Sequence, residues 1–191
     1  HKNHRKGPYK MRQTVATMPN YAPAIEQETM DPMGHHIQDF ARSQGDKPAL
    51  TDEKGTLTWA QMLARANRIA NRLRADGLQT GDTVAGLSED SNDYVCLYLG
   101  TLIAGGCMVP LSGMASGEAL ALMVEDCDTR FLFVSEKNLP LYNEIRDQLK
   151  RVQPAQRIGM NTREVDSGQD LDLWLGDTTD EARPAEVTPD D

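Results

Sequence analysis

Residues 81–114 read GDTVAGLSEDSNDYVCLYLGTLIAGGCMVPLSGM, and this stretch decides the fold. A turn at Gly81-Asp82 precedes the short apolar run 84–87, which is typical of a buried strand. Residues 94–104 are apolar on nearly every face, which predicts a helix covered on all sides. Residues 107–111 form a second short apolar run. Strand, helix and strand in this order predict an α/β fold with a parallel sheet layered between helices.

Upstream of this stretch, the sequence predicts a hairpin followed by a long helix. Two short strand-like runs flank the turn Lys54-Gly55. Thr58 and Gln61, three residues apart, form a capping box, which indicates a helix over residues 59–76. One face of this helix is apolar. The opposite face, which we interpret as solvated and not as a phosphate or nucleic-acid patch, carries Arg65, Arg68 and Arg72.

Downstream, a further repeat of helix and strand is expected. The pattern predicts a helix over residues 117–125, a strand over 130–135, a helix over 139–152 and a weak last strand over 157–160. No segment of roughly 20 to 50 residues is repeated, which excludes solenoids and propellers. The residues of the first helix that we expect to face inward are Leu120, Met123 and Val124.

The two ends of the chain differ from its middle in charge and pattern. The first twelve residues contain five basic residues and no acid, and residues 164–191 contain ten acidic residues against one arginine. Neither end has enough periodic apolar side chains to offset the entropy of ordering it. We therefore expect a disordered basic arm at residues 1–30, an α/β domain at 31–160 and an acidic linker at 161–191.

The composition favours a cytoplasmic protein without a membrane span. Residues 94–111 are 18 residues without a charge, near the minimum for a transmembrane helix, but paired glycines and a proline interrupt them. The basic arm lacks the apolar core of a signal peptide and any amphipathic pattern, so we assign it neither targeting nor nucleic-acid binding. Because three cysteines without close pairing do not form a disulfide framework, we expect free, buried thiols at Cys96, Cys107 and Cys127.

The common catalytic and nucleotide-binding patterns are absent from the sequence. It contains neither Gly-x-x-x-x-Gly-Lys-Ser/Thr nor Gly-x-Gly-x-x-Gly. His35 and His36 are adjacent, so on a helix they would point in different directions, and we expect no metal site. A serine or cysteine nucleophile needs a neighbouring base, which none of the four histidines is placed to supply. We therefore assign no catalytic residue to this chain.

A set of short motifs runs in order through residues 33 to 160. Within the central stretch these are Gly-Asp-Thr-Val-Ala at 81–85, Ser91-Asn92, and AGGCMVPL at 104–111. Upstream stand PAL at 48–50 and LTWAQM at 57–62, and EAL, DCD and FLFV follow downstream from residue 118. In this order and spacing they resemble the amino-terminal part of AMP-forming acyl-CoA synthetases, which belong to the wider adenylate-forming enzymes. Gly105-Gly106 and Ser112-Gly113 depart from the family's usual pairs, which leaves the substrate class open.

The resemblance implies the reaction and its cofactors. Such an enzyme activates a carboxylic acid, here expected to be a fatty acid, with ATP and Mg²⁺ to an acyl-AMP and passes the acyl group to coenzyme A. In that family the phosphate-binding loop, the adenine and ribose motifs and the catalytic lysine come later in the chain. The resemblance therefore implies an amino-terminal fragment that ends just before the phosphate-binding loop, inactive alone and without tight binding of any cofactor.

One segment is a candidate site within this chain. Ligands of open parallel sheets bind beyond the carboxyl ends of the strands. We therefore take Leu111, Ser112, Gly113 and Met114 as a candidate wall of the substrate pocket, with a plain loop as the alternative. Two other functions stay open: another adenylate-forming enzyme, such as a peptide-synthetase adenylation domain or a luciferase-like enzyme, and a non-catalytic α/β binding module. We expect no nucleic-acid partner, and the sequence leaves the oligomeric state open.

Overall fold

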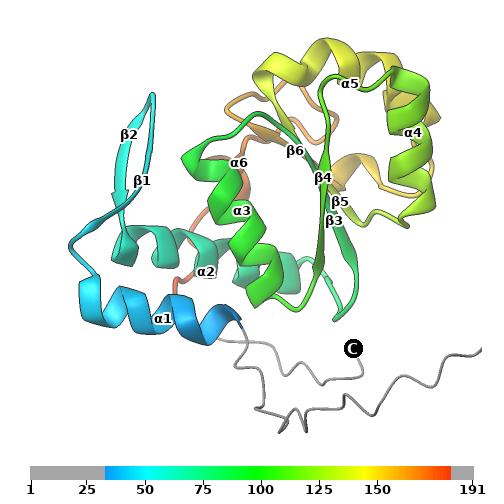
Figure 1. Ribbon diagram of the computed structural model, residues 1–191. Helices are drawn as coiled ribbons and strands as arrows, with labels where there is room; N and C mark the ends of the chain where they lie inside the picture. Colours follow the sequence, from blue (N-terminus) through cyan, green and yellow to red (C-terminus); the bar gives the residue numbers. More distant parts are fainter. Residues whose placement is uncertain (1–32, 182–191) are drawn as a thin grey trace, which may run out of the picture. The chain divides into compact units, whose positions relative to one another are not determined.

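The computed structural model describes residues 33–181 (Figure 1). The expected basic arm and the last ten residues of the expected acidic linker lie outside this part of the chain. At the centre are four parallel strands: β3 (Thr83–Leu87), β4 (Cys107–Leu111), β5 (Phe131–Ser135) and β6 (Arg157–Met160). They are hydrogen-bonded in the order β4-β3-β5-β6. The parallel sheet predicted from residues 81–114 is confirmed.

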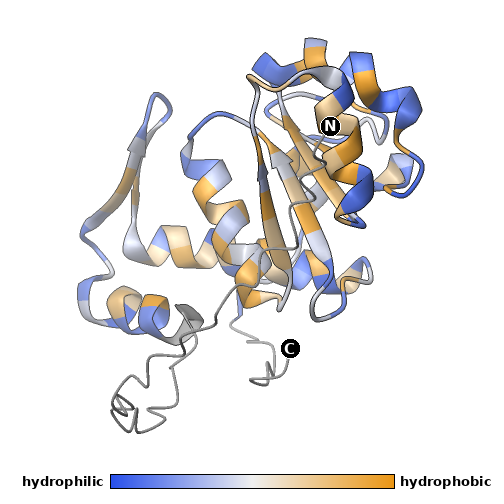
Figure 2. Cartoon of the chain, turned by 45° about the vertical axis from the view of Figure 1, so that its right-hand side comes forward, coloured by the Kyte–Doolittle hydropathy of each residue, from blue (hydrophilic) through white to orange (hydrophobic). Residues whose placement is uncertain are grey.

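Helices cover both faces of this sheet and divide the core in two. On one face, Val84, Phe131 and Phe133 pack with α1 (Met33–Gln44), α2 (Trp59–Ala75), α3 (Asn92–Ile103) and α6 (Leu171–Leu175). On the other face, Ala85, Leu132 and Val134 pack with α4 (Gly117–Asp126) and α5 (Leu139–Ile145). Figure 2 shows the apolar character of the strands between these helices. The arrangement is the expected sheet layered between helices.

Local sequence signals account for α2 and α3. At the start of α2, the Thr58 hydroxyl accepts from the Gln61 amide at 3.3 Å, and the Gln61 side chain accepts from the Thr58 amide at 2.9 Å. This confirms the predicted capping box. The Ser91 side chain caps α3. A Cβ on Gly100 would lie 2.7 Å from the Ala66 carbonyl oxygen, so glycine there allows α2 and α3 to approach closely.

The predicted hairpin is present as a separate two-stranded sheet. β1 (Pro48–Asp52) pairs antiparallel with β2 (Gly55–Thr58). The Asp52 carboxylate accepts from the backbone amide of Asn92 at 2.8 Å, and the Asn92 side chain donates to the Gly55 carbonyl at 3.0 Å. The hairpin turn is therefore bound to the first turn of α3.

The prediction of an acidic linker from residue 161 is wrong for residues 161–181, the part of it that the structure describes. This segment packs on the domain: Leu171, Trp174 and Leu175 of α6 are buried in the core. Trp174 meets the Phe133 ring edge-on at 5.3 Å between centroids, and its indole donates to Asp76 at 2.8 Å. The sequence of residues 171–175 predicts a short apolar helical turn within the acidic tail, and α6 confirms it. Its three buried apolar side chains, at helical spacing, help to order the segment.

The prediction that the arginine face of α2 is exposed to solvent is also wrong. Arg65 donates to Asp172 at 2.9 Å. Arg68 donates to the carbonyls of Gly176 at 2.6 Å and Thr178 at 3.1 Å, and Arg72 lies over the Trp174 ring. The three arginines bind the segment that follows β6 and help to hold it on α2.

Two predictions for the other face of the sheet need correction. The expected helix over residues 139–152 ends early, as α5 followed by the 3₁₀ turn Arg146–Gln148. The Arg157 guanidinium donates to the carbonyls of Arg146, Leu149 and Val152, which provides these groups with partners outside a continued helix. Further 3₁₀ turns cover Glu136–Asn138 and Pro154–Gln156. In α4, Leu120 and Val124 are buried as expected, but Met123 is exposed.

The cysteines are free among the described residues, yet they differ in burial. Cys96 is buried, Cys127 is intermediate and Cys107 is exposed, so the expectation of a buried Cys107 is wrong. Cys107 begins β4, which is an edge strand of the sheet, and the buried side chains of that strand are Met108 and Leu111. The uncharged run at residues 94–111 is divided between α3 and β4. No helix among residues 33–181 is both long and apolar enough to cross a membrane.

Candidate functional site

The carboxyl ends of the four strands meet at one edge of the sheet, the carboxyl edge, where parallel α/β proteins bind ligands. The candidate pocket wall follows β4 at this edge. Leu111 is buried and packs in the core, whereas Ser112, Gly113 and Met114 are exposed, Met114 by 96%. The Met114 amide donates to the Ser112 hydroxyl at 3.3 Å. Leu111 therefore anchors the loop, and the next three residues present it to solvent.

A polar cluster that the sequence did not reveal lies beside this loop. We name Glu89, Ser135, Lys137 and Asn138 the edge cluster. The Ser135 hydroxyl donates to the Glu89 carboxylate at 2.6 Å, and the Asn138 side chain donates to the Ser135 hydroxyl at 2.9 Å. Lys137 lies 3.9 Å from Glu89. The sequence signal for this cluster is a pair of polar residues where each of two buried strands ends, Ser88-Glu89 after β3 and Ser135-Glu136 at the end of β5.

The loop after β4 lies directly against the edge cluster. A Cβ on Gly113 would lie 2.5 Å from the side-chain oxygen of Asn138, which is closer than real Cβ atoms approach. Only glycine fits this position without a shift of the loop or of Asn138. Strands β3, β4 and β5 thus contribute to one surface, in which a carboxylate, a hydroxyl and an amide are hydrogen-bonded together.

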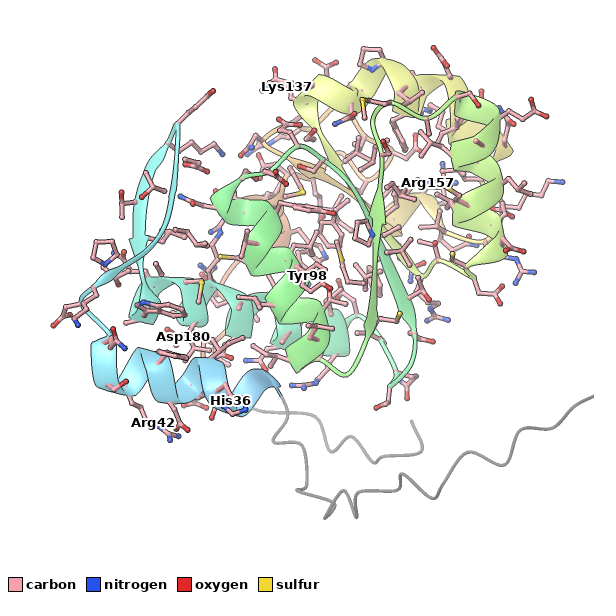
Figure 3. The ribbon with its side chains drawn as sticks, in the orientation of Figure 1. His36, Arg42, Tyr98, Lys137, Arg157 and Asp180 are labelled. Carbon is pink, nitrogen blue, oxygen red and sulfur yellow. The ribbon has the colours of Figure 1, made fainter. Side chains whose placement is uncertain are left out.

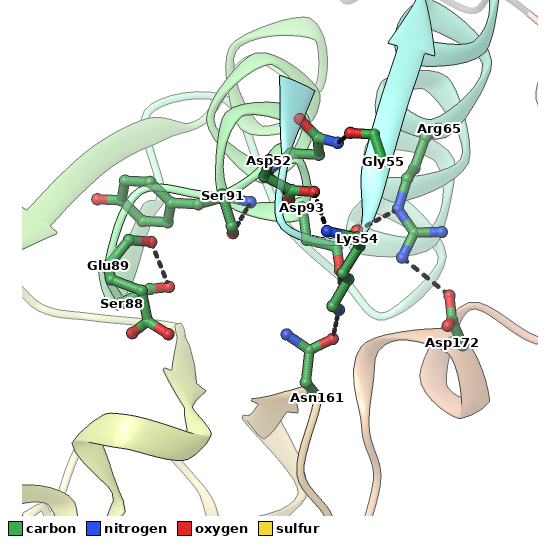
Figure 4. A network of polar contacts seen from close by, with 12 residues as sticks. Asp52, Lys54, Gly55, Arg65, Ser88, Glu89, Ser91, Asp93, Asn161 and Asp172 are labelled. Atoms are coloured by element: carbon green, nitrogen blue, oxygen red, sulfur yellow. Dashed lines mark hydrogen bonds and ion pairs between the residues drawn. The ribbon is translucent and has the colours of Figure 1, made fainter. Parts of the chain in front are cut away.

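A second polar cluster connects the hairpin to the domain beside a cavity of about 250 Å³. We name Asp52, Lys54, Arg65, Asp93, Asn161 and Asp172 the hairpin cluster (Figure 4). Lys54 contacts Asn161 and lies 3.4 Å from Asp93. Arg65 donates to Asp93 at 2.6 Å. Both cations of this cluster therefore have carboxylate partners.

The ionisation of the hairpin cluster follows from these contacts. The backbone N–H of Asn92, as the largest cause, lowers the pKa of Asp52 despite the opposing effect of burial. Burial alone would lower the pKa of Arg65, but Asp93 and Asp172 outweigh it and raise the pKa. Both shifts favour the charged forms of Asp52 and Arg65. The cluster is suited to holding the hairpin, α2, α3 and α6 together more than to binding a phosphate.

Metal ligands and nucleophiles are the remaining candidates for a functional site among residues 33–181. Among residues 33–181, no group of three or more His, Cys, Asp or Glu side chains is placed to hold a metal ion. Burial raises the pKa of the Cys96 thiol to about 12, so this thiol is protonated near neutral pH. Cys96 is therefore a core residue.

The sequence is similar to one protein family and to several characterised proteins. The model of the family described as AMP-binding enzyme matches residues 37–191. A 3-hydroxybenzoate/4-hydroxybenzoate CoA ligase of Thauera aromatica is 33% identical over 119 residues, which is 62% of this chain and 22% of the ligase. A fatty acid–[acyl-carrier-protein] ligase of Streptomyces coeruleorubidus is 27% identical over 151 residues, 78% of this chain and 27% of that ligase. The chain thus spans about a quarter of the length of these two relatives.

Solved structures share the fold. A benzoate CoA ligase from Burkholderia xenovorans matches with a TM-score of 0.74 at 17% identity, over 85% of this chain and 32% of that one. A fatty acyl CoA synthetase of Mycobacterium tuberculosis matches with a TM-score of 0.72 at 24% identity, over 83% of this chain and 30% of that one. At these identities the likeness concerns the arrangement of helices and strands.

Proposed function

We propose, on the premise that this chain belongs to the family of AMP-binding enzymes, that the whole protein activates a carboxylic acid with ATP to an acyl-AMP and transfers the acyl group to coenzyme A. The family match over residues 37–191 carries this proposal. A fatty acid is our first substrate class, supported by the fatty acid ligase among the relatives. An aromatic acid is the second, because the hydroxybenzoate CoA ligase is the more identical of the two relatives described above. We place the reaction in the cytoplasm.

ATP, Mg²⁺ and coenzyme A belong to this proposal as cofactors and co-substrate of the whole protein. The described residues do not fit a triphosphate. Lys54 and Arg65 are each bound to carboxylates, and the serine side chains of Ser91 and Ser116 cap the N-termini of α3 and α4. Binding a triphosphate needs clustered backbone N–H groups and placed cations. We therefore expect the 191-residue chain by itself to neither bind ATP tightly nor adenylate an acid.

The contribution that we propose for this chain is a wall for the acid at the carboxyl edge. Leu111 fixes the end of β4, Gly113 lies against Asn138, and Ser112 and Met114 form the exposed surface. Since a Cβ at position 113 must displace the loop or Asn138, Gly113→Ala should raise KM for the acid several-fold. KM for ATP should stay nearly unchanged, because the change is confined to the acid wall.

The test is acid-dependent pyrophosphate release by the whole protein, with fatty acids of graded length and hydroxybenzoic acids as substrates. The exposed Lys150→Ala serves as a matched surface variant. Absence of pyrophosphate release with any acid would refute the proposed reaction. Transfer of the acyl group to a carrier protein and not to coenzyme A would favour a peptide-synthetase type of enzyme. An unchanged KM for the acid in Gly113→Ala would refute the proposal that residues 111–114 form a wall of the acid site.

A further inference from the structure

An open groove between α1 and α2 lies apart from both polar clusters and has a volume of about 360 Å³. This volume is at the lower end of the range for small-molecule sites, about 300 to 1,000 Å³. Figure 3 labels Arg42 and Asp180, two of its lining residues, beside these helices. The proposed reaction makes no use of this groove.

The groove is open because its walls are built from small side chains. Ala41 of α1 and Ala60 and Ala64 of α2 line it, with Leu63 as the larger apolar side chain. The rings of Phe40 and Trp59 stack at 5.1 Å between centroids, which fixes one helix against the other. Three alanines between two helices held in this way leave a space that neither helix can fill.

Two buried polar atoms in the groove lack partners among the described residues. Asn67 is only 4% exposed, and its side-chain nitrogen donates to the Asp180 carbonyl at 3.1 Å. That bond sets the orientation of the amide and leaves its oxygen, Oδ1, without a partner in residues 33–181. The Gln38 nitrogen, Nε2, is likewise buried and unpaired in this part of the chain. An unpaired buried polar atom is destabilising, so each such atom calls for an explanation.

We infer that this groove binds a small neutral molecule carrying a primary carboxamide. The ligand's N–H donates to Asn67 Oδ1, its C=O accepts from Gln38 Nε2, and its apolar part packs against Leu63 and the alanines. A carboxylate fits worse, because it has no proton to offer to Asn67 Oδ1. Arg42 also lines the groove, but it is largely exposed and pairs with Asp39 at 3.0 Å, so it attracts an anion only weakly. The site is thus distinct in chemistry from the acid site of the proposed reaction.

The experiment is a titration of the 191-residue chain with benzamide and, as a matched probe, benzoate, followed by NMR of the side-chain amides of Gln38 and Asn67. For so small a ligand we expect a Kd on the order of 1 to 10 mM. Benzoate should bind at least about tenfold more weakly, since it leaves Asn67 Oδ1 unpaired. Shifts confined to the groove residues would support the site.

Two variants of α1 separate specific binding in the groove from the general effect of a new negative charge on this helix. Gln38→Glu replaces the hydrogen-bond donor by an acceptor. The affinity for benzamide should therefore fall at least about tenfold, because a site built for one polar partner rejects a mismatched one. Gln44→Glu, on the same helix but outside the groove, should leave the affinity unchanged. Equal binding of benzamide and benzoate, no saturable binding of benzamide, or full binding by Gln38→Glu would overturn the inference. Acid activation by the whole protein is measured separately and does not depend on these outcomes.

Discussion

Replacing Arg157 by methionine tests the core on the α4 and α5 side of the sheet. Arg157 is only 5% exposed, and its guanidinium donates to the Leu149 carbonyl at 2.7 Å, the Arg146 carbonyl at 3.0 Å and the Val152 carbonyl at 2.9 Å, besides pairing with Asp166. Methionine would fill much of the space but leave the three carbonyls without this donor. Asp166 keeps Arg146 and Tyr142 as partners, so the loss comes mainly from the carbonyls. A buried polar group left without its partner costs about 1 to 3 kcal/mol, so the three carbonyls together cost about 3 to 5 kcal/mol or more.

That loss is large for a domain of this size. Native domains have about 5 to 15 kcal/mol of stability in total, and for about 150 to 250 residues each kcal/mol lowers Tm by about 2 to 4 °C. We therefore expect Tm to fall by about 10 °C in Arg157→Met. Urea unfolding followed by the fluorescence of Trp59 and Trp174 measures the change in free energy directly.

The matched control is Arg151→Met. Arg151 also pairs with an aspartate, Asp128, but both side chains are largely exposed. Exposed pairs contribute about 0 to 1 kcal/mol, so this variant should unfold close to the wild type. If Arg157→Met and Arg151→Met unfold at the same urea concentration, the inference that Arg157 organises the segment after α5 is refuted.

Two further predictions follow from ionisation and burial. Burial alone would raise the pKa of Asp166, but hydrogen bonds from Tyr142 and Arg157 and the charges of the neighbouring arginines outweigh burial and lower the pKa below the usual value of an aspartate. Because the pKa of Asp166 is lower in the folded than in the unfolded state, ionised Asp166 stabilises the fold at a pH above the unfolded-state pKa. This stabilisation is lost as the pH falls through the lower, folded-state pKa. The stability difference between wild type and Arg157→Met should therefore shrink below about pH 4, and a constant difference in urea titrations between pH 6 and pH 3 would contradict this. For the thiols, Cys107 should react rapidly with Ellman's reagent in native buffer and Cys96 only after unfolding; rapid native labelling of Cys96, located by mass spectrometry, would contradict its burial.

Periodicity predicted the sheet and its main helices because the signals there are local. The capping box at Thr58 and the apolar runs of β3, β4 and β5 depend on neighbours in the sequence, and the structure confirms them. The edge cluster could not be predicted in the same way. Glu89 and Ser135 are 46 positions apart and meet only because β3 and β5 are adjacent in the sheet. Strand order, which periodicity does not contain, is what brings them together.

The misread segment after β6 explains why two separate sites depend on the same part of the chain. Asn161 and Asp172 complete the hairpin cluster, whereas the Asp180 carbonyl orients Asn67 in the groove between α1 and α2. Between them, Trp174 fixes the segment in the core, and Arg68 holds the carbonyls of Gly176 and Thr178. Asp172 of this segment is the partner of Arg65 in α2, so part of the acidic charge that suggested a linker helps to attach the segment. Loosening Trp174 would release Asp172 from Arg65 and Asp180 from Asn67 together, because both contacts rely on the position of this one segment.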